Sequence, residues 1–166
     1  MTNEYAFDLA WNREDRAAIF DKLKEERLLK YNMHHKWKPE LEDWLEMTDP
    51  GNQVDVYKIF WSGEWCGIYY LTPGFNYIPL IHFAIWKQFR QRAVAIGNAA
   101  LEHFDMFYQL PAVMGLTPAH FRHVFPSIRK WGFEILGSIP AALVVATADD
   151  PEKPCDGVLS VNYRRI

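Results

Sequence analysis

The sequence predicts a single α/β domain with a mixed sheet, which spans residues 1–166. Helical and strand patterns follow one another in the order β-α-α-β-β-β-α-β-α-β-β. One predicted strand, Ile78 to Trp86, is apolar on both faces, as expected of a central strand that is covered on both sides. No internal repeat, linker or low-complexity segment divides the chain, and its length suits one sizeable core.

The composition excludes several classes of protein. The chain is 49% hydrophobic, which argues against disorder, and its net charge of −3 argues against a dedicated nucleic-acid binder. No apolar run reaches the ~20 residues that cross a bilayer, and no signal peptide follows Met1. Cys66 and Cys155 have no metal-ligand spacing and are typical of reduced thiols. We therefore expect a cytoplasmic protein with no membrane, nucleic-acid or metal partner.

The first part of the chain predicts a short strand followed by two helices. Tyr5 to Leu9 alternates as a strand does. Asn12 can cap an amphipathic helix from Arg13 to Lys30, whose charged residues form a solvated face. Pro39 suits the first turn of a second helix, Pro39 to Met47.

A hairpin, the central strand and a long helix come next. Val54 to Trp61 and Trp65 to Leu71 are predicted strands joined by a turn at Ser62-Gly63, and Thr72-Pro73-Gly74 closes the pair. The central strand follows, and a helix then runs to about Phe107.

The last part of the chain predicts a strand, a helix and a final hairpin. Thr117 and Pro118 favour a helix start, with Thr117 as the N-cap, and Gly132 favours its end after Trp131. Pro126 would lie inside this helix and should kink or divide it. The remaining strands are expected at Ala112 to Leu116, Glu134 to Ala146 and Gly157 to Arg164.

The turn after the central strand is basic. Lys87, Arg90 and Arg92 lie in a window, Glu64 to Glu102, that holds no acidic residue between its two ends. A strand, a basic turn and a helix N-terminus together form an anion site, because the first helical N–H groups lack partners and the helix dipole is positive there. We expect this turn to hold the pyrophosphate of a nucleotide-like cofactor.

The residues at this helix start are small. Ala93, Ala95 and Gly97 would let a phosphate approach the backbone closely, and the N–H groups of Gln91 to Ala95 would be the free donors. The alternative is an ordinary exposed basic turn before an Ala-rich helix.

This stretch resembles the cofactor motif of the GNAT superfamily of N-acetyltransferases, which has Gln or Arg, two residues, Gly, one residue, then Gly or Ala. Trp86-Lys-Gln-Phe-Arg90 is similar to the family's strand exit. Arg90, Ala93 and Ala95 fill the motif in one register, and Arg92, Ala95 and Gly97 in another. We prefer the first because it fits the strand exit better. The motif's first Gly is absent from both.

Two later segments extend the resemblance over most of the chain. Gly115-Leu-Thr-Pro118, a helix, then Lys130-Trp-Gly-Phe133 is similar to the family's strand–helix–Gly-Phe segment. The closing strand, which ends at Tyr163, is similar to the family's last. The resemblance implies a GNAT-like mixed, mostly antiparallel sheet flanked by helices.

The resemblance also implies a transferase that uses acetyl-CoA and moves the acetyl group directly to an amine of unknown identity. Phe83 and Ile85 would offer backbone contacts to the pantetheine, and the Ile85 N–H would stabilise the oxyanion. Coenzyme A would be held at its pyrophosphate by Arg90, Gln91, Arg92, Ala93, Val94, Ala95 and Gly97. A homodimer is compatible with the pattern, which does not specify one.

His82 is the first candidate for the catalytic base, because it lies on the central strand and imidazole titrates near neutral pH. The alternative is a core histidine, or one on the far face of the sheet. Glu64 is a weaker candidate base. His120 and His123 should flank the cofactor groove without a catalytic role.

Two departures from the family pattern put activity in question. Ile128 stands where many members carry a Tyr that protonates the thiolate, and Ala119-His120-Phe121 replaces the usual Asn. The alternative function is therefore a catalytically degenerate GNAT-fold protein that acts as a binding or assembly component. The general style of the sequence is similar to GNAT-like proteins of phages and prophages.

Overall fold

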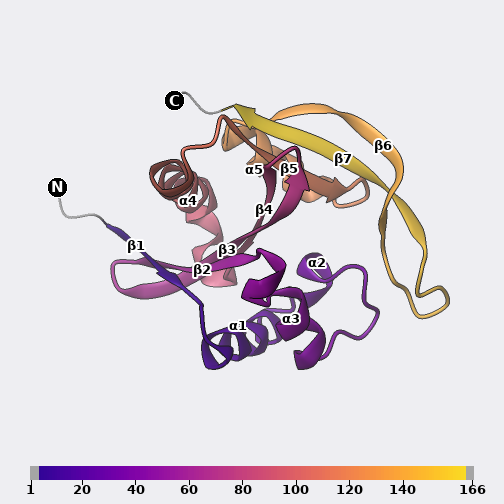
Figure 1. Ribbon diagram of the computed structural model, residues 1–166, viewed down its shortest axis with the longest axis horizontal. Coiled ribbons are helices and arrows are strands. Elements are labelled where there is room, and N and C mark those ends of the chain that lie inside the picture. Colours follow the sequence, from indigo (N-terminus) through magenta and orange to yellow (C-terminus); the bar gives the residue numbers. More distant parts are fainter. Residues whose placement is uncertain (1–3, 164–166) are drawn as a thin grey trace.

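The computed structural model describes residues 4–163 and contains one seven-stranded sheet with helices on both faces (Figure 1). The strand order is β1-β2-β3-β4-β5-β7-β6, and only the β4–β5 pair is parallel. The predicted α/β class with a mixed, mostly antiparallel sheet is confirmed. The strands are β1 (Tyr5–Leu9), β2 (Asp55–Trp61), β3 (Glu64–Phe75), β4 (Ile78–Ile85), β5 (Ala112–Pro118), β6 (Glu134–Val144) and β7 (Pro154–Tyr163).

The helices are divided between the two faces of the sheet. In Figure 1, α1, α2 and α3 lie together in the lower part of the view, and α4 and α5 lie in its upper part, on the other side of β3 and β4. β4 is the middle strand of the seven, as its apolar character on both faces predicts. The helices are α1 (Arg13–Glu25), α2 (Leu29–Asn32), α3 (Leu41–Met47), α4 (Ala93–Tyr108) and α5 (Phe125–Lys130), with 3-10 turns η1 (Pro50–Asn52), η2 (Lys87–Arg92) and η3 (Arg122–Val124).

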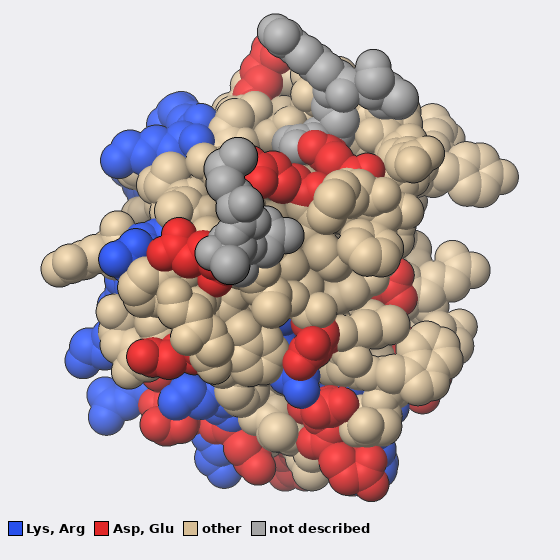
Figure 2. Space-filling model, turned by 90° about the vertical axis from the view of Figure 1, so that its left-hand side faces the viewer, with Lys and Arg blue, Asp and Glu red and all other residues tan. Residues whose placement is uncertain are grey.

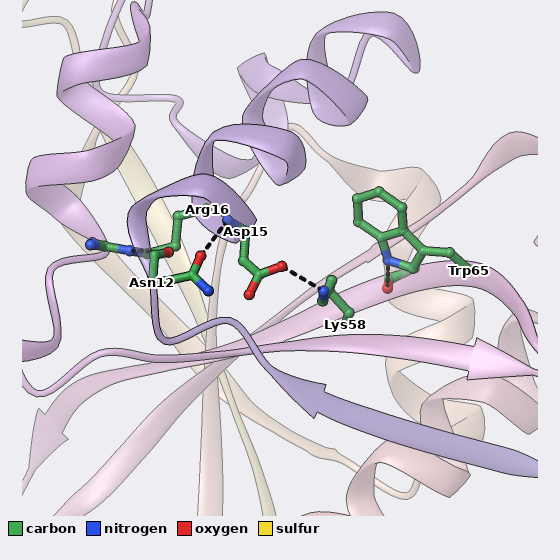
Figure 3. A network of polar contacts seen from close by, with 6 residues as sticks. Asn12, Asp15, Arg16, Lys58 and Trp65 are labelled. Carbon is green, nitrogen blue, oxygen red and sulfur yellow. Dashed lines mark hydrogen bonds and ion pairs between the residues drawn. The ribbon is translucent and has the colours of Figure 1, made fainter.

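The start of α1 is fixed by the predicted cap and by an ion pair to the sheet (Figure 3). The Asn12 side chain accepts a hydrogen bond from the Asp15 N–H at 2.7 Å, and the Asp15 carboxylate pairs with Lys58 of β2 at 2.8 Å. Ile19 and Leu23 are fully buried, whereas Lys24 is exposed. Figure 2 shows acidic and basic side chains intermixed in the lower part of that view, at the level of α1 in Figure 1.

Two predicted boundaries in the first half of the chain are wrong. α1 ends at Glu25 and not at Lys30, because Arg27 takes the left-handed conformation and a separate short helix follows. The segment Thr72-Pro73-Gly74 belongs to β3 and does not close it. The turn comes later, at Asn76 and Tyr77, which both have positive φ.

The predicted helix start at Thr117 is also wrong. Thr117 and Pro118 end β5, where Thr117 is paired with Val158 of β7, and α5 begins only at Phe125. Pro126 therefore lies in the first turn of α5, where its missing N–H costs nothing, and it does not kink the helix. Gly132 does follow the helix in the left-handed conformation, with φ of 82°.

Two findings concern the cellular environment that the sequence leads us to expect. Within residues 4–163, no helix is long and apolar enough to cross a membrane. Both cysteines are free thiols, and burial of Cys66 in the core raises the pKa of its thiol to about 11. Arg164, the predicted end of the last strand, lies outside the described residues.

Candidate active site

The neighbouring strands β4 and β5 diverge and leave a cavity between them. Their only paired residues are Leu80 and Met114, so the chains separate from His82 and Gly115 onward. The cavity has a volume of about 150 Å³. It is lined by Tyr31, Asn32, His34, Ile81, His82, Phe83, Gly115, Leu116, Thr117, Pro118, Phe121, Val124, Ile128, Trp131, Phe133 and Ser160.

The cavity passes from one face of the sheet to the other. On the face with α1–α3, the His82 ring stacks on Tyr70, with 4.4 Å between ring centroids. On the face with α4 and α5, the Phe83 ring packs against Trp131, with a centroid separation of 4.7 Å. Successive side chains on a strand point to opposite faces, so His82 and Phe83 open the cavity toward both helical layers.

The backbone of β4 also faces this gap. The Trp86 N–H donates a hydrogen bond to the Cys66 carbonyl on β3 at 3.0 Å. Because the polar groups of a strand alternate in direction, those of Phe83 and Ile85 point away from β3 and toward the side of β5. Phe83 lines the cavity itself, whereas Ile85 lies beyond its lining.

The predicted base, His82, is half-buried and lines the cavity. Its Nε2 lies 3.0 Å from the Thr72 hydroxyl oxygen on β3. Burial, and then the neighbouring His34, lowers the pKa of His82 from 6.5 to about 4. The imidazole is therefore neutral at pH 7. The residue is both a hydrogen-bonded histidine, as the alternative had it, and a side chain at the cavity wall.

The weaker candidate base, Glu64, does not line the cavity, and neither do the two histidines that were expected beside the cofactor groove. Glu64 is exposed in the β2–β3 hairpin, where it is paired with Trp61. His120 lies 3.4 Å from the Cys155 thiol, and the His123 ring packs against Tyr31 at 5.5 Å. The two histidines thus stand close to lining residues but outside the cavity.

The basic turn after β4 forms the six-residue 3-10 turn η2, and its two arginines have different surroundings. The Arg90 guanidinium is exposed and has no hydrogen-bond or ion-pair partner within residues 4–163. The Arg92 guanidinium stacks over the Trp61 ring at 3.8 Å. Arg90 is therefore the arginine whose donors are available to an anion, as in the preferred register.

The residues around the first turn of α4 also differ in their surroundings. Gln91 and Ala95 are exposed, and Ala93 and Val94 are half-buried. Gly97 is buried beneath the Trp131 indole, and a Cβ added to it would lie 2.2 Å from Trp131 Nε1. The absence of a side chain at Gly97 therefore serves helix packing.

The N–H groups near this turn are partly occupied. The Ala93 N–H donates to the Arg90 carbonyl, so the prediction that all donors from Gln91 to Ala95 are free is wrong for Ala93. At the other end of η2, the Lys87 N–H donates to the Glu26 carboxylate at 2.8 Å. This contact was not predictable from the sequence, because Glu26 belongs to the turn after α1, 61 positions before Lys87.

Sequence reasoning missed the wall of the cavity that α2 and the last hairpin provide. Tyr31 and His34 line the cavity from α2 and the loop after it. The His34 Nδ1 lies 2.8 Å from the Val144 carbonyl, and the Ala146 N–H donates to the His34 carbonyl at 2.8 Å. The end of the β6–β7 hairpin is thereby held against this loop (Figure 1).

The position that departs from the family's Tyr is part of the cavity. Ile128 is buried on α5 and lines the cavity with an apolar side chain. Ser160 of β7 adds a hydroxyl to the wall, which donates to the Gly115 carbonyl at 3.3 Å. Among residues 4–163, His, Cys, Asp and Glu form no group of three or more that could hold a metal ion.

Known proteins match this chain in structure but not in sequence. No protein-family model and no curated protein sequence matches this chain. Spermidine N-acetyltransferase from Vibrio cholerae, in complex with CoA and spermine, matches with a TM-score of 0.73 at 11% identity over 98% of this chain and 96% of that one. AAC(6')-Ib in complex with ribostamycin and coenzyme A matches with a TM-score of 0.74 at 15% identity over 98% and 94%.

A third match, ribosomal-protein-S5-alanine acetyltransferase from Vibrio fischeri, has a TM-score of 0.67 at 12% identity over 98% of this chain and 94% of that one. Each comparison spans nearly all of both chains, and the shared feature is the fold. The chain thus shares the fold of these three acetyltransferases, which is the fold that its resemblance to the GNAT superfamily implies.

Proposed function

We propose that the protein is an N-acetyltransferase that moves the acetyl group of acetyl-CoA directly to an amine. The observation that carries this proposal is the cavity between β4 and β5, with the free backbone edge of β4 on one side and the basic turn at the strand's end. The likeness to structures solved with coenzyme A supports the same cofactor.

Three parts of the chain would bind acetyl-CoA, namely the end of β4, the turn η2 and the start of α4. The exposed guanidinium of Arg90 would pair with the pyrophosphate, beside Gln91, Arg92 and the first turn of α4 from Ala93 to Ala95. The backbone groups of Phe83 and Ile85 would pair with the pantetheine amides, as a further strand does. Gly97 drops out of this set because Trp131 covers it.

Acetyl-CoA supplies a thioester whose C–S bond breaks as the C–N bond to the amine forms, and a thiol pKa near ~8.5 makes the departing thiolate a fair leaving group. The Ile85 N–H would stabilise negative charge on the acetyl oxygen. Because the thiolate can depart without being protonated, no acid is required at the position of the apolar Ile128 in the cavity wall.

His82 would accept the proton that the amine releases. Its Nε2 is engaged by Thr72, and its Nδ1 has no hydrogen-bond partner within residues 4–163. A pKa of about 4 means that the imidazolium cannot persist at pH 7, so the proton must pass on to water. His82 is therefore proposed as a relay between amine and solvent.

The test is thiol release from acetyl-CoA in the presence of a panel of primary amines, after calorimetry has established cofactor binding. Turnover of any amine, reduced at least about 10-fold by His82→Gln, is the expected result. Cofactor binding without turnover across the panel would contradict the enzymatic proposal and favour a binding component.

A further inference from the structure

The cavity between β4 and β5 has no formal charge in its wall. None of its lining residues is Asp, Glu, Lys or Arg among the residues that the structure describes. Its polar groups are hydroxyls, one amide and two imidazoles. The lowering of the pKa of His34 and His82 by burial keeps both rings neutral at pH 7.

Within residues 4–163, the two imidazoles of the wall have no acidic neighbour. Each of these two imidazoles is influenced by another histidine and by no acid. A cation lies next to the wall, because the Lys30 ammonium is 4.9 Å from the centre of the Tyr31 ring. A second cationic group on an acceptor would lose its water here without gaining an ion pair.

The size of the cavity limits the acceptor further. The end of the cofactor would share its 150 Å³, so the acceptor group that enters is at most the size of a benzene ring. The bonds between His34 and the end of the β6–β7 hairpin hold the α2 side of the cavity in place. Phe121, Tyr31 and Leu116 offer apolar surface to a ring.

We propose, on the basis of the acetyltransferase function above, that the acceptor is a small monoamine with an uncharged, ring-sized body, such as an arylalkylamine. Amines that carry several positive charges would be poor acceptors. Acetyl transfer would form the N–C bond at the single amine and break the C–S bond of the thioester. Coenzyme A would leave as the thiolate, and the proton released by the amine would pass through His82 to water.

The experiment compares two amines of the same shape that differ by one charge. 2-Phenylethylamine and its 4-aminomethyl derivative are titrated into the protein by calorimetry, with and without saturating coenzyme A, and both are assayed for thiol release with acetyl-CoA. We expect the monoamine to bind at least about 10-fold more tightly than the diamine. Spermine should not be acetylated.

A matched pair of variants tests the cause of this preference. Thr117→Asp adds a carboxylate to the cavity wall, and Thr117→Asn changes the shape in the same way without charge. We expect the Asp variant to shift the ratio of the two affinities toward the diamine by about 10-fold or more and the Asn variant to leave that ratio near the wild-type value.

Equal or tighter binding of the diamine by the wild-type protein, or no binding of either amine, would overturn the acceptor proposal. Because binding is read without turnover, this result is distinct from failure of the acetyltransferase proposal itself. That failure would appear as absence of coenzyme A binding, or as monoamine binding without thiol release.

Discussion

At the scale of single residues, His82 and Arg90 carry the two most specific proposals. His82 is held between the Tyr70 ring and the Thr72 hydroxyl and lines the cavity. Arg90 is exposed at the end of η2 with no partner within residues 4–163. Burial keeps the His82 imidazole neutral, and exposure leaves the N–H donors of Arg90 available to a ligand.

The depressed pKa of His82 predicts a loss of stability in acid. The pKa of the His82 imidazole is about 6.5 in the unfolded chain and about 4 in the folded protein. The unfolded chain therefore takes up this proton first as the pH falls, and folding becomes less favourable between these two values. His82→Gln removes this difference. We expect the change in free energy of unfolding between pH 7.5 and 5 to shrink by about 1–2 kcal/mol in the variant.

Urea denaturation at the two pH values measures this effect. His34 and His103, whose pKa values burial also lowers, remain in the variant, so a reduced slope is expected and not a flat profile. An unchanged difference between the two pH values would show that His82 titrates in the folded protein as it does in the unfolded chain.

Arg90→Ala should weaken coenzyme A binding by roughly 10- to 150-fold, because it removes a charge-assisted contact worth about 1.5–3 kcal/mol. Arg92→Ala is the matched control, since its guanidinium is stacked on Trp61. Calorimetric titration of both variants decides between the registers, and a larger loss in Arg92→Ala would reverse the assignment.

At the scale of elements, the contact between α4 and α5 fixes the wall of the cavity. The Trp131 indole lies over Gly97, donates a hydrogen bond to the Ala93 carbonyl at 3.1 Å and packs against Phe83 of β4. A small residue on one helix and a large ring after the other thus set how closely the two elements approach.

Gly97→Ala tests this contact by the sign of its effect. In a helix interior, Ala is favoured over Gly by about 0.5–1 kcal/mol, but here the added methyl group meets the Trp131 ring. We expect a net loss of about 1–3 kcal/mol in the free energy of unfolding. In a Trp131→Ala background, the same substitution should become stabilising.

Denaturant unfolding of the four proteins in this double-mutant cycle gives the coupling between Gly97 and Trp131. A destabilising effect of equal size in both backgrounds would show that the indole does not cause it.

At the scale of the whole molecule, the sequence was sufficient for the central strand and for the order of elements except the short helix α2. The apolar faces of Ile78–Ile85 and the Asn12 cap are local signals, and each is found in the structure. The end of β5 was not predictable in this way. Thr117 and Pro118 form a good helix start locally, and only pairing with β7 makes them a strand.

The candidate site was predictable in part for the same reason. The sequence places His82 and Phe83 on the central strand and Arg90 just after it, and the structure agrees with this placement. Tyr31, His34 and Ser160 carry no motif, and they reach the cavity only through tertiary folding. The role of Gly97 was misread because its partner, Trp131, lies 34 positions further along the sequence.

The central claim is that acetyl-CoA binds along β4, with its pantetheine in the gap beside β5. Calorimetric titration with acetyl-CoA, paired with adenosine 3′,5′-bisphosphate as a ligand that lacks the pantetheine arm, tests it most directly. We expect saturable binding of acetyl-CoA, weaker binding of the bisphosphate and a rise in Tm with acetyl-CoA concentration. No heat and no thermal shift at millimolar acetyl-CoA would contradict it.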